Sequence, residues 1–163
     1  MKNKVILSLG SNLGDRESNL LKVIKYLNNY NILNELKISN IYETPPFGVV
    51  NQPDYLNMCI SGYTNQSALT LISLLKNLEI EIGRVDRGKW KEREIDIDIL
   101  FYEDLVLNND KLILPHPRLQ DRRFVLMPAT EIEENFIHPI FEKSLKKLLE
   151  ECKDDSVLKR FIN

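Results

Sequence analysis

The chain has 163 residues, with 22 lysines and arginines against 24 aspartates and glutamates, and a formal net charge of −2 at pH 7. This length suits one domain with its own hydrophobic core, which we expect to cover residues 1–163. The sequence has neither an apolar run long enough for a membrane helix nor a signal peptide, and its slightly acidic balance disfavours a general nucleic-acid surface. Cys59 and Cys152 lack the spacing of a disulfide framework or a zinc site. We therefore expect a cytoplasmic protein.

Strands and helices are predicted to alternate along the chain, without a change of composition that would mark a linker. In chain order we expect a strand at 4–9, a helix at 15–30, strands at 36–43 and 55–63, a helix at 67–83 and a strand at 94–102. Asp15 and Ser67 are placed to cap the two helices, and Gly83 to end the second. Pro45 and Pro46 end the second strand because proline cannot donate to a ladder.

This order, β-α-β-β-α-β, is that of a ferredoxin-like α+β fold, a βαββαβ sandwich in which two helices pack on an antiparallel sheet. The third strand indicates how the two faces of the sheet differ. Its apolar face carries Leu56, Met58 and Ile60, whereas Tyr55 and Asn57 look the other way. We expect the helices on the apolar face and a free opposite face that can hold a site. A short edge strand at 112–114 and a closing helix at 141–152 complete the prediction.

The fourth strand carries the pattern that points most directly to chemistry. Its strict alternation places Asp96 and Asp98 on one face, about 6.6 Å apart along the strand. Two carboxylates so placed can share hard divalent cations such as Mg²⁺ together with phosphate oxygens. The same alternation also marks a half-solvated strand with outward polar side chains. Arg93 and Trp90, just upstream, favour the site, because Arg93 can bind phosphate with its planar fork and Trp90 can cover a nucleobase.

The loop before this strand partly matches a phosphate-binding motif. Residues 83–90 read GRVDRGKW, which follows G-x-x-x-x-G-K but has Trp90 where serine or threonine is required. That motif also needs a strand before it and a helix after it, and here the order is reversed. We interpret 84–93 instead as a basic lid that is open in the free protein because its charges repel, and that closes over a nucleotide. An ordinary solvated loop is the alternative.

Six collinear segments resemble the 6-hydroxymethyl-7,8-dihydropterin pyrophosphokinase family, folate-pathway enzymes that move pyrophosphate from ATP to a pterin alcohol. The segments are GSNLGD at 10–15, ETPPFG at 43–48, QPDYLN at 52–57, LEIEIGR at 78–84, WKEREIDIDIL at 90–100 and PHPRLQDRRFVLMPATEI at 115–132. The resemblance implies the same ferredoxin-like fold, a single pyrophosphokinase domain, ATP and 6-hydroxymethyl-7,8-dihydropterin as substrates, and two Mg²⁺ ions. We expect a monomer with no nucleic-acid or membrane partner.

The resemblance also assigns roles to single positions. Asp96 and Asp98 match the metal-binding carboxylates. The catalytic set that matches is Arg84, Trp90, Arg93, Asp96 and Asp98. The nucleotide-binding positions that match are Glu79, Arg93, Ile99, Lys111, His116 and Arg122. The pterin-binding positions that match are Thr44, Pro45, Phe47, Tyr55, Asn57 and Phe124, with Tyr55 and Phe124 stacking on the two faces of the ring.

Several of these residues also have plainer explanations. Tyr55 and Phe124 could serve core packing, His116 could be held in a tight turn between two prolines, and Glu79 could form an i, i+3 pair with Lys76. A non-catalytic ferredoxin-like module that binds a nucleotide or a pterin is the alternative function. An RNA-binding domain is disfavoured, because no predicted strand carries the aromatic and basic pattern of RNA recognition.

Overall fold

The structure is a computed structural model that describes residues 2–46, 48, 51–89 and 91–162. Its strands are β1 (Asn3–Ser11), β2 (Asn34–Ile38), β3 (Tyr42–Thr44), β4 (Tyr55–Thr64), β5 (Asp96–Tyr102), β6 (Leu107–Asn108), β7 (Ile113–Leu114) and β8 (Lys159–Arg160). Its helices are α1 (Arg16–Asn29), α2 (Ala68–Ile82), the short 3-10 helix η1 (Leu119–Asp121), α3 (Arg123–Glu133) and α4 (Leu145–Glu151). Within these described ranges, every helix is too short or too polar to cross a membrane.

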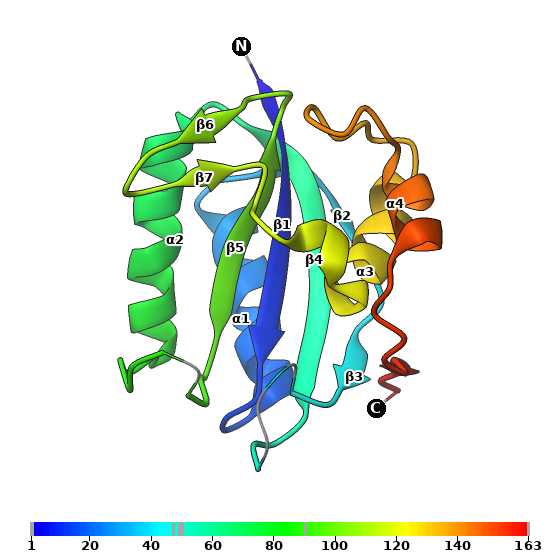
Figure 1. Cartoon of the computed structure of the whole chain (residues 1–163). Coiled ribbons are helices and arrows are strands. Elements are labelled where there is room, and N and C mark those ends of the chain that lie inside the picture. Colours follow the sequence, from blue (N-terminus) through cyan, green and yellow to red (C-terminus); the bar gives the residue numbers. More distant parts are fainter. Residues whose placement is uncertain (1, 47, 49–50, 90, 163) are drawn as a thin grey trace.

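The main sheet is antiparallel and runs in the order β5-β1-β4-β3-β8, with β2 also paired to β4 (Figure 1). β1 is central, because Val5 lies opposite Gly62 of β4 and also opposite Tyr102 of β5. α1 follows β1, and α2 joins β4 to β5. This is the arrangement of a β-α-β-β-α-β unit, so the predicted ferredoxin-like α+β fold is confirmed.

Local sequence explains both long helices. The Asp15 side chain accepts the backbone N–H of Ser18 at 3.0 Å, and the Ser67 hydroxyl accepts that of Thr70 at 3.2 Å. These contacts satisfy amide donors that have no partner within the helix. Gly83 follows α2 in the left-handed conformation, with a φ of 114°, which glycine adopts readily because it lacks a Cβ. The predicted caps are confirmed.

The predicted second strand is in fact two strands, β2 and β3. Between them the Ser39 hydroxyl accepts the N–H of Cys59 at 2.9 Å, where a continuous ladder would use a backbone carbonyl. The ladder is therefore interrupted at Ser39. The predicted edge strand at 112–114 also differs, because Ile113–Leu114 pairs with β6 in a separate two-stranded sheet.

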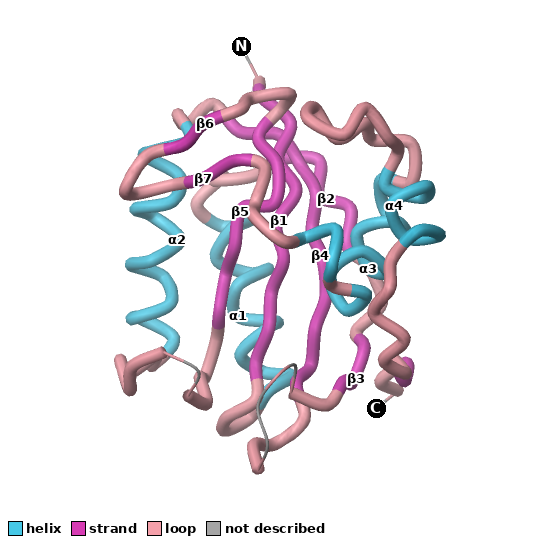
Figure 2. The backbone as a smooth tube through the Cα atoms, viewed as in Figure 1, coloured by secondary structure: helices cyan, strands magenta, loops and turns pink. Residues whose placement is uncertain are grey.

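Both faces of the sheet carry helices, which corrects the expectation of a free face (Figure 2). α1 and α2 pack on one face over a core that includes Leu7, Leu9, Leu56 and Met58. On the other face α3 and α4 pack over a second core, with Ile6, Cys59 and Phe101 from the sheet and Val125, Leu126, Leu145 and Leu148 from the helices. The site has only the part of the second face that α3 and α4 leave uncovered.

The sequence contains a signal for α3 that the prediction did not use. Val125, Ala129 and Ile132 recur at helical spacing and pack against the second core. Pro128 lies inside the same helix, and proline in a helix interior normally argues against a helix. Tertiary packing against β4 outweighs that local preference.

Candidate active site

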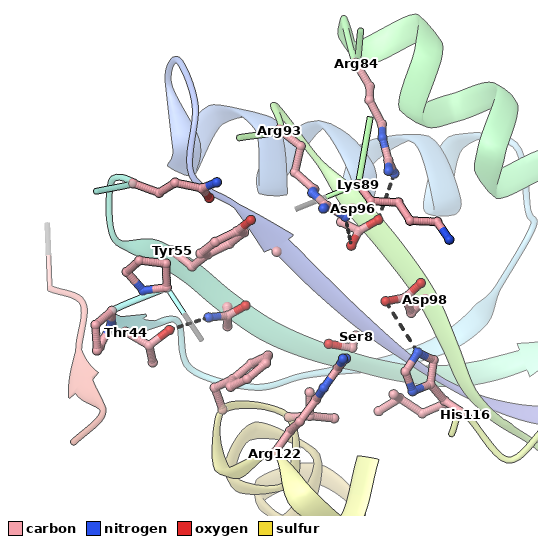
Figure 3. A pocket seen from close by; sticks show the side chains of 18 of the residues that line it. Ser8, Thr44, Tyr55, Arg84, Lys89, Arg93, Asp96, Asp98, His116 and Arg122 are labelled. Atoms are coloured by element: carbon pink, nitrogen blue, oxygen red, sulfur yellow. Dashed lines mark hydrogen bonds and ion pairs between the residues drawn. The ribbon is translucent and has the colours of Figure 1, made fainter. Parts of the chain in front are cut away.

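A cavity of about 730 Å³ opens on the uncovered part of the second face. Its floor comes from β1, β4 and β5, and its walls come from the segment after β3, the loop before β5 and the start of α3 (Figure 3). This volume is typical of sites that take a small molecule or cofactor. Of the residues expected at the site, the cavity brings together Thr44, Pro45, Tyr55, Asn57, Arg84, Arg93, Asp96, Asp98, His116, Arg122 and Phe124.

The two aspartates of β5 face the cavity next to a glycine and a serine of β1. Asp96 lies opposite Gly10 and Asp98 opposite Ser8 in the antiparallel register. A Cβ on Gly10 would stand 3.0 Å from Asn57 Oδ1, a tight contact that would require the Asn57 side chain to shift. Gly10 therefore leaves open the space between the carboxylates of β5 and the polar side chains of β4.

Asp96 is surrounded by positive charge. Arg84 Nη1 lies 2.7 Å from Asp96 Oδ1, Arg93 Nη1 lies 2.8 Å from Oδ2, and Lys76 Nζ lies 4.0 Å from Oδ1. Burial would raise the pKa of Asp96, but the charges of Arg93, Lys76 and Arg84 outweigh it and hold the pKa below its ordinary value. Asp96 is therefore an anion whose two oxygens are both engaged by arginines.

At Asp98 the effects that raise the pKa outweigh those that lower it. Among the described residues, the basic side chain that comes within ion-pair distance of this carboxylate is His116, whose Nε2 lies 3.9 Å from Asp98 Oδ2. Burial and the negative charge of Asp96 raise the pKa of Asp98 above its ordinary value, although Lys76, His116 and Arg122 act the other way. The two carboxylates thus share a face but differ in how strongly the protein itself neutralises them.

Arg122 reaches into the cavity from the side opposite the aspartates (Figure 3). Its Nε is buried and has no hydrogen-bond partner among the described residues, and the same holds for His116 Nδ1. Burial and the neighbouring Arg118 lower the pKa of Arg122, and burial lowers that of His116. Buried polar groups are normally satisfied, so these two atoms keep hydrogen-bonding capacity that the described residues do not use.

Glu79 lies behind the cavity and does not line it. It is a buried residue, 2% exposed, that accepts the N–H of Ile97 at 2.7 Å, the ammonium of Lys76 at 2.7 Å and the guanidinium of Arg84. Burial raises its pKa even though Lys76 and the Ile97 N–H act against the rise. The i, i+3 pair with Lys76 is therefore present, and Glu79 holds Arg84 beside β5. Its expected contact with the nucleotide stays a prediction.

Two expected nucleotide residues have no side chain in the cavity. Ile99 is 2% exposed and belongs to the first core. The backbone N–H and C=O of Ile97 bond to Glu79 and Lys76 beside α2, and Ile99, two residues on, presents its backbone to the same side. Ile99 can thus contact a ligand only through its backbone. Lys111 lies in the turn between β6 and β7, away from the cavity lining.

The far end of the cavity gathers the residues expected to bind a pterin. Asn57 Nδ2 donates to Thr44 Oγ1 at 2.7 Å, in a buried contact between β4 and the end of β3. Tyr55 lies on the same face of β4 as Asn57, and its pKa is raised mainly by burial. Phe124 enters from the first turn of α3. Residues 47 and 90, the sites of Phe47 and Trp90, lie outside the described residues.

The cavity also includes residues that the prediction did not assign, among them Ser8, Gly10, Lys89 and Leu100. Ser8 and Gly10 alternate with the core residues Leu7 and Leu9, so period-two spacing along the first strand was the signal for them. Leu100 could not be found in this way. A register shift opposite Ile6 and Leu7 breaks the alternation, so that Leu100 and Phe101 both face the second core.

The basic loop does not show the mutual repulsion that we expected of it. Arg87 pairs with Glu94 at 2.6 Å, and Arg84 and Arg93 both pair with Asp96. The Arg87 pair is strong enough to lower the pKa of Glu94 to about 2. In the described part of the loop these three arginines are neutralised by carboxylates, which removes most of the repulsion that we expected. Closure of the loop over a nucleotide stays a prediction.

Comparison with known proteins agrees with this geometry. The family model described as 7,8-dihydro-6-hydroxymethylpterin-pyrophosphokinase (HPPK) matches residues 6–134. A protein of Aquifex aeolicus (strain VF5) named 2-amino-4-hydroxy-6-hydroxymethyldihydropteridine pyrophosphokinase is 45% identical over 157 residues, which cover 96% of this chain and 94% of the relative. A protein of the same name from Bacillus subtilis (strain 168) is 38% identical over 132 residues, 81% of this chain and 79% of the relative.

A solved structure shows the same fold. It is described as an HPPK-DHPS in complex with substrates, and it superposes with a TM-score of 0.69 at 16% identity, covering 93% of this chain and 43% of that chain. This chain thus spans less than half the length of the solved protein. The likeness concerns the fold alone, whereas the sequence matches are close and cover most of the chain. The chain belongs to the 7,8-dihydro-6-hydroxymethylpterin-pyrophosphokinase family.

Proposed function

We propose that the chain transfers pyrophosphate from ATP to the hydroxymethyl group of 6-hydroxymethyl-7,8-dihydropterin, giving the pterin diphosphate and AMP in folate biosynthesis. Membership of the family supports this activity. The structural observation that carries it is a single cavity in which Asp96 and Asp98 face Arg122, while Tyr55 and Phe124 line the other end. A non-catalytic binding module is disfavoured, because the chain matches named pyrophosphokinases over most of its length and its cavity places paired carboxylates opposite Arg122.

The donor set in the cavity fits magnesium bound together with a nucleotide. Asp96 and Asp98 are hard oxygen ligands on one strand face. Within the described residues no group of three histidine, cysteine, aspartate or glutamate side chains could hold a metal by itself. Mg²⁺ usually completes its shell with water and substrate phosphate oxygens, so two carboxylates suffice. We propose two Mg²⁺ ions here, which when bound would neutralise phosphate charge.

The arginines of the cavity then bind the phosphates of the nucleotide. Arg84 and Arg93 exchange their contacts with Asp96 for contacts with phosphate, and Arg122 binds phosphate from the opposite wall. Guanidinium groups suit this role because their planar fork matches phosphate oxygens. Together these residues hold the nucleotide so that its β-phosphorus faces the pterin end of the cavity.

At the pterin end, Tyr55 and Phe124 hold the ring and Asn57 contacts its polar edge. The hydroxymethyl oxygen then forms a bond to the β-phosphorus and loses its proton to water, while the bond from that phosphorus to the bridging α–β oxygen breaks and AMP leaves with that oxygen. Positioning two substrates and neutralising phosphate charge supply most of the acceleration in phosphoryl transfer. We further propose that the chain acts as one domain and as a monomer in the cytoplasm.

The activity is tested by incubating the chain with ATP, magnesium and the reduced pterin alcohol, followed by mass spectrometry. We expect AMP and a pterin that has gained two phosphates. Reactions without pterin and with Asp98→Asn serve as controls for ATP hydrolysis and for contaminating enzymes. Bound but unchanged ligands would instead support the non-catalytic module.

A further inference from the structure

Residues 152–162 run from the end of α4 past α3 to β3, where β8 forms the edge of the sheet (Figure 1). They lie beyond residues 6–134, the part matched by the family model. Two of their contacts involve the two walls of the pterin end of the cavity. One wall is the start of α3, which carries Phe124, and the other is the end of β3, which carries Thr44.

At the first wall, Asp154 caps a helix to which it does not belong. Its Oδ2 accepts the backbone N–H of Arg123, the first residue of α3, at 2.9 Å. Arg122, at the cap position of α3, makes no capping hydrogen bond of its own. The other oxygen of Asp154 accepts the N–H of Ser156 at 3.0 Å, which fixes the orientation of the carboxylate. Asp154 thus supplies the cap that local sequence leaves out.

At the second wall, the end of the tail adds a strand to β3. Lys159 and Arg160 form β8, opposite Glu43 and Tyr42. The N–H of Phe161 then donates to Ile41 O at 2.8 Å, and the Phe161 side chain packs against the first core. β3 has only three residues and pairs with β4 on one side. Pairing with β8 on its other side therefore adds substantially to the hydrogen bonds that hold β3 in the sheet.

We infer that residues 154–161 form a strap that positions the two walls of the pterin end of the cavity, with Asp154 holding the start of α3 and β8 pairing with Tyr42 and Glu43, the residues of β3 that lead to Thr44. This inference rests on the proposed function of the cavity. Each wall is weakly fixed by its own sequence, because α3 lacks a local cap and β3 is short. The strap raises the fraction of ligand-free molecules whose pterin pocket is already formed, and apparent affinity scales with that fraction.

The test compares Asp154→Ala with Asp155→Ala in the full chain. Asp155 is exposed and adjacent, so its substitution is a matched control for the loss of one negative charge. Pterin affinity is measured by calorimetry with saturating magnesium and a non-hydrolysable ATP analogue, and nucleotide affinity is measured without pterin. We expect Asp154→Ala to weaken pterin binding about fivefold, the size of a lost helix cap if it acts wholly on the pocket. Nucleotide binding should weaken less, because Arg122 beside the capped residue is one of three arginines proposed to bind phosphate.

Two further variants separate positioning from folding. Asp154→Asn keeps an oxygen acceptor for the Arg123 N–H and should restore pterin affinity close to that of the unmodified chain. Phe161→Ala should weaken pterin binding from the other wall and speed amide exchange at residues 41–44, whereas Asp154→Ala should speed exchange at 123–126.

Three results distinguish the possibilities. Unchanged pterin affinity in both Asp154→Ala and Phe161→Ala, with only a lower melting temperature, would overturn the strap and leave the tail a stabilising element. Equal weakening of both ligands would overturn it as well, because it would indicate general damage. Failure of the unmodified chain to bind pterin would count against the proposed function instead.

Discussion

Arg84 and Asp96 form an ion pair of 2.7 Å between the residue after the C-cap of α2 and the first residue of β5. Glu79 binds the same guanidinium nitrogen of Arg84 from behind. One of the two cavity carboxylates is thus paired with a guanidinium that also lines the cavity. Under the proposed function, a magnesium nucleotide would exchange these partners, so that Asp96 contacts the metal and Arg84 contacts the phosphates.

Replacement of either aspartate should remove nearly all turnover while leaving the fold intact. In Asp96→Asn and Asp98→Asn a neutral amide cannot offset the charge of the metal and phosphates, so we expect turnover to fall at least about 100-fold, equivalent to ~2.7 kcal/mol. Steady-state assays at saturating magnesium measure this, and circular dichroism checks the fold. Asp104→Asn, an exposed carboxylate outside the cavity, is the control. Normal turnover in both cavity variants would refute the metal assignment.

Removal of either aromatic side chain should weaken pterin binding more than nucleotide binding. For Tyr55→Ala and Phe124→Ala we expect a loss of about fivefold or more, since one ring stacking contact contributes on the order of 1 kcal/mol. Calorimetry with each ligand decides the matter. Tyr30→Ala removes a tyrosine that is 65% exposed and should leave both affinities unchanged. Equal losses for the two ligands would point to core damage.

Replacement of Arg122 should stabilise the ligand-free protein but weaken nucleotide binding. Its guanidinium is partly buried with Nε unsatisfied, and a buried charge without a partner destabilises the ligand-free protein. We expect Arg122→Met to raise the free energy of unfolding by about 1 kcal/mol and to weaken nucleotide binding. Lys25→Met, at an exposed position of α1 outside the cavity lining, should do neither. Urea unfolding without ligand and nucleotide titration measure the two effects, and a destabilised Arg122→Met would contradict the prediction.

His138 should make stability fall in mildly acidic solution. Burial lowers its pKa in the folded state, where Nδ1 accepts the N–H groups of Ile140 and Phe141. The unfolded chain takes up a proton near the ordinary value of about 6.5, so the contribution is fully present above that pH and is lost as pH falls below it. Urea unfolding at about pH 7.5 and about pH 5.5 should show a larger loss for the unmodified chain than for His138→Gln. Equal losses would exclude His138 as the cause.

The sequence by itself determined the elements that depend on local chemistry. Periodicity and capping residues predicted α1, α2 and the central strands, because Asp15, Ser67 and Gly83 act on neighbours a few residues away. Alternation along β5 placed Asp96 and Asp98 on one face, because side chains two apart on a strand point the same way. The collinear motifs then indicated the family that the comparisons show.

Only the tertiary structure decided what depends on contacts between distant segments. The second face is half covered because α3 and α4 pack on β4 and β5, and Glu79 is buried because it meets Ile97 and Arg84 across the gap between α2 and β5. Asp154 caps a helix that begins 31 residues earlier. β8 pairs with β3, although most of the chain separates the two strands in the sequence. Such contacts form because they lower the free energy of the whole packed fold, so a local pattern of residues cannot predict them.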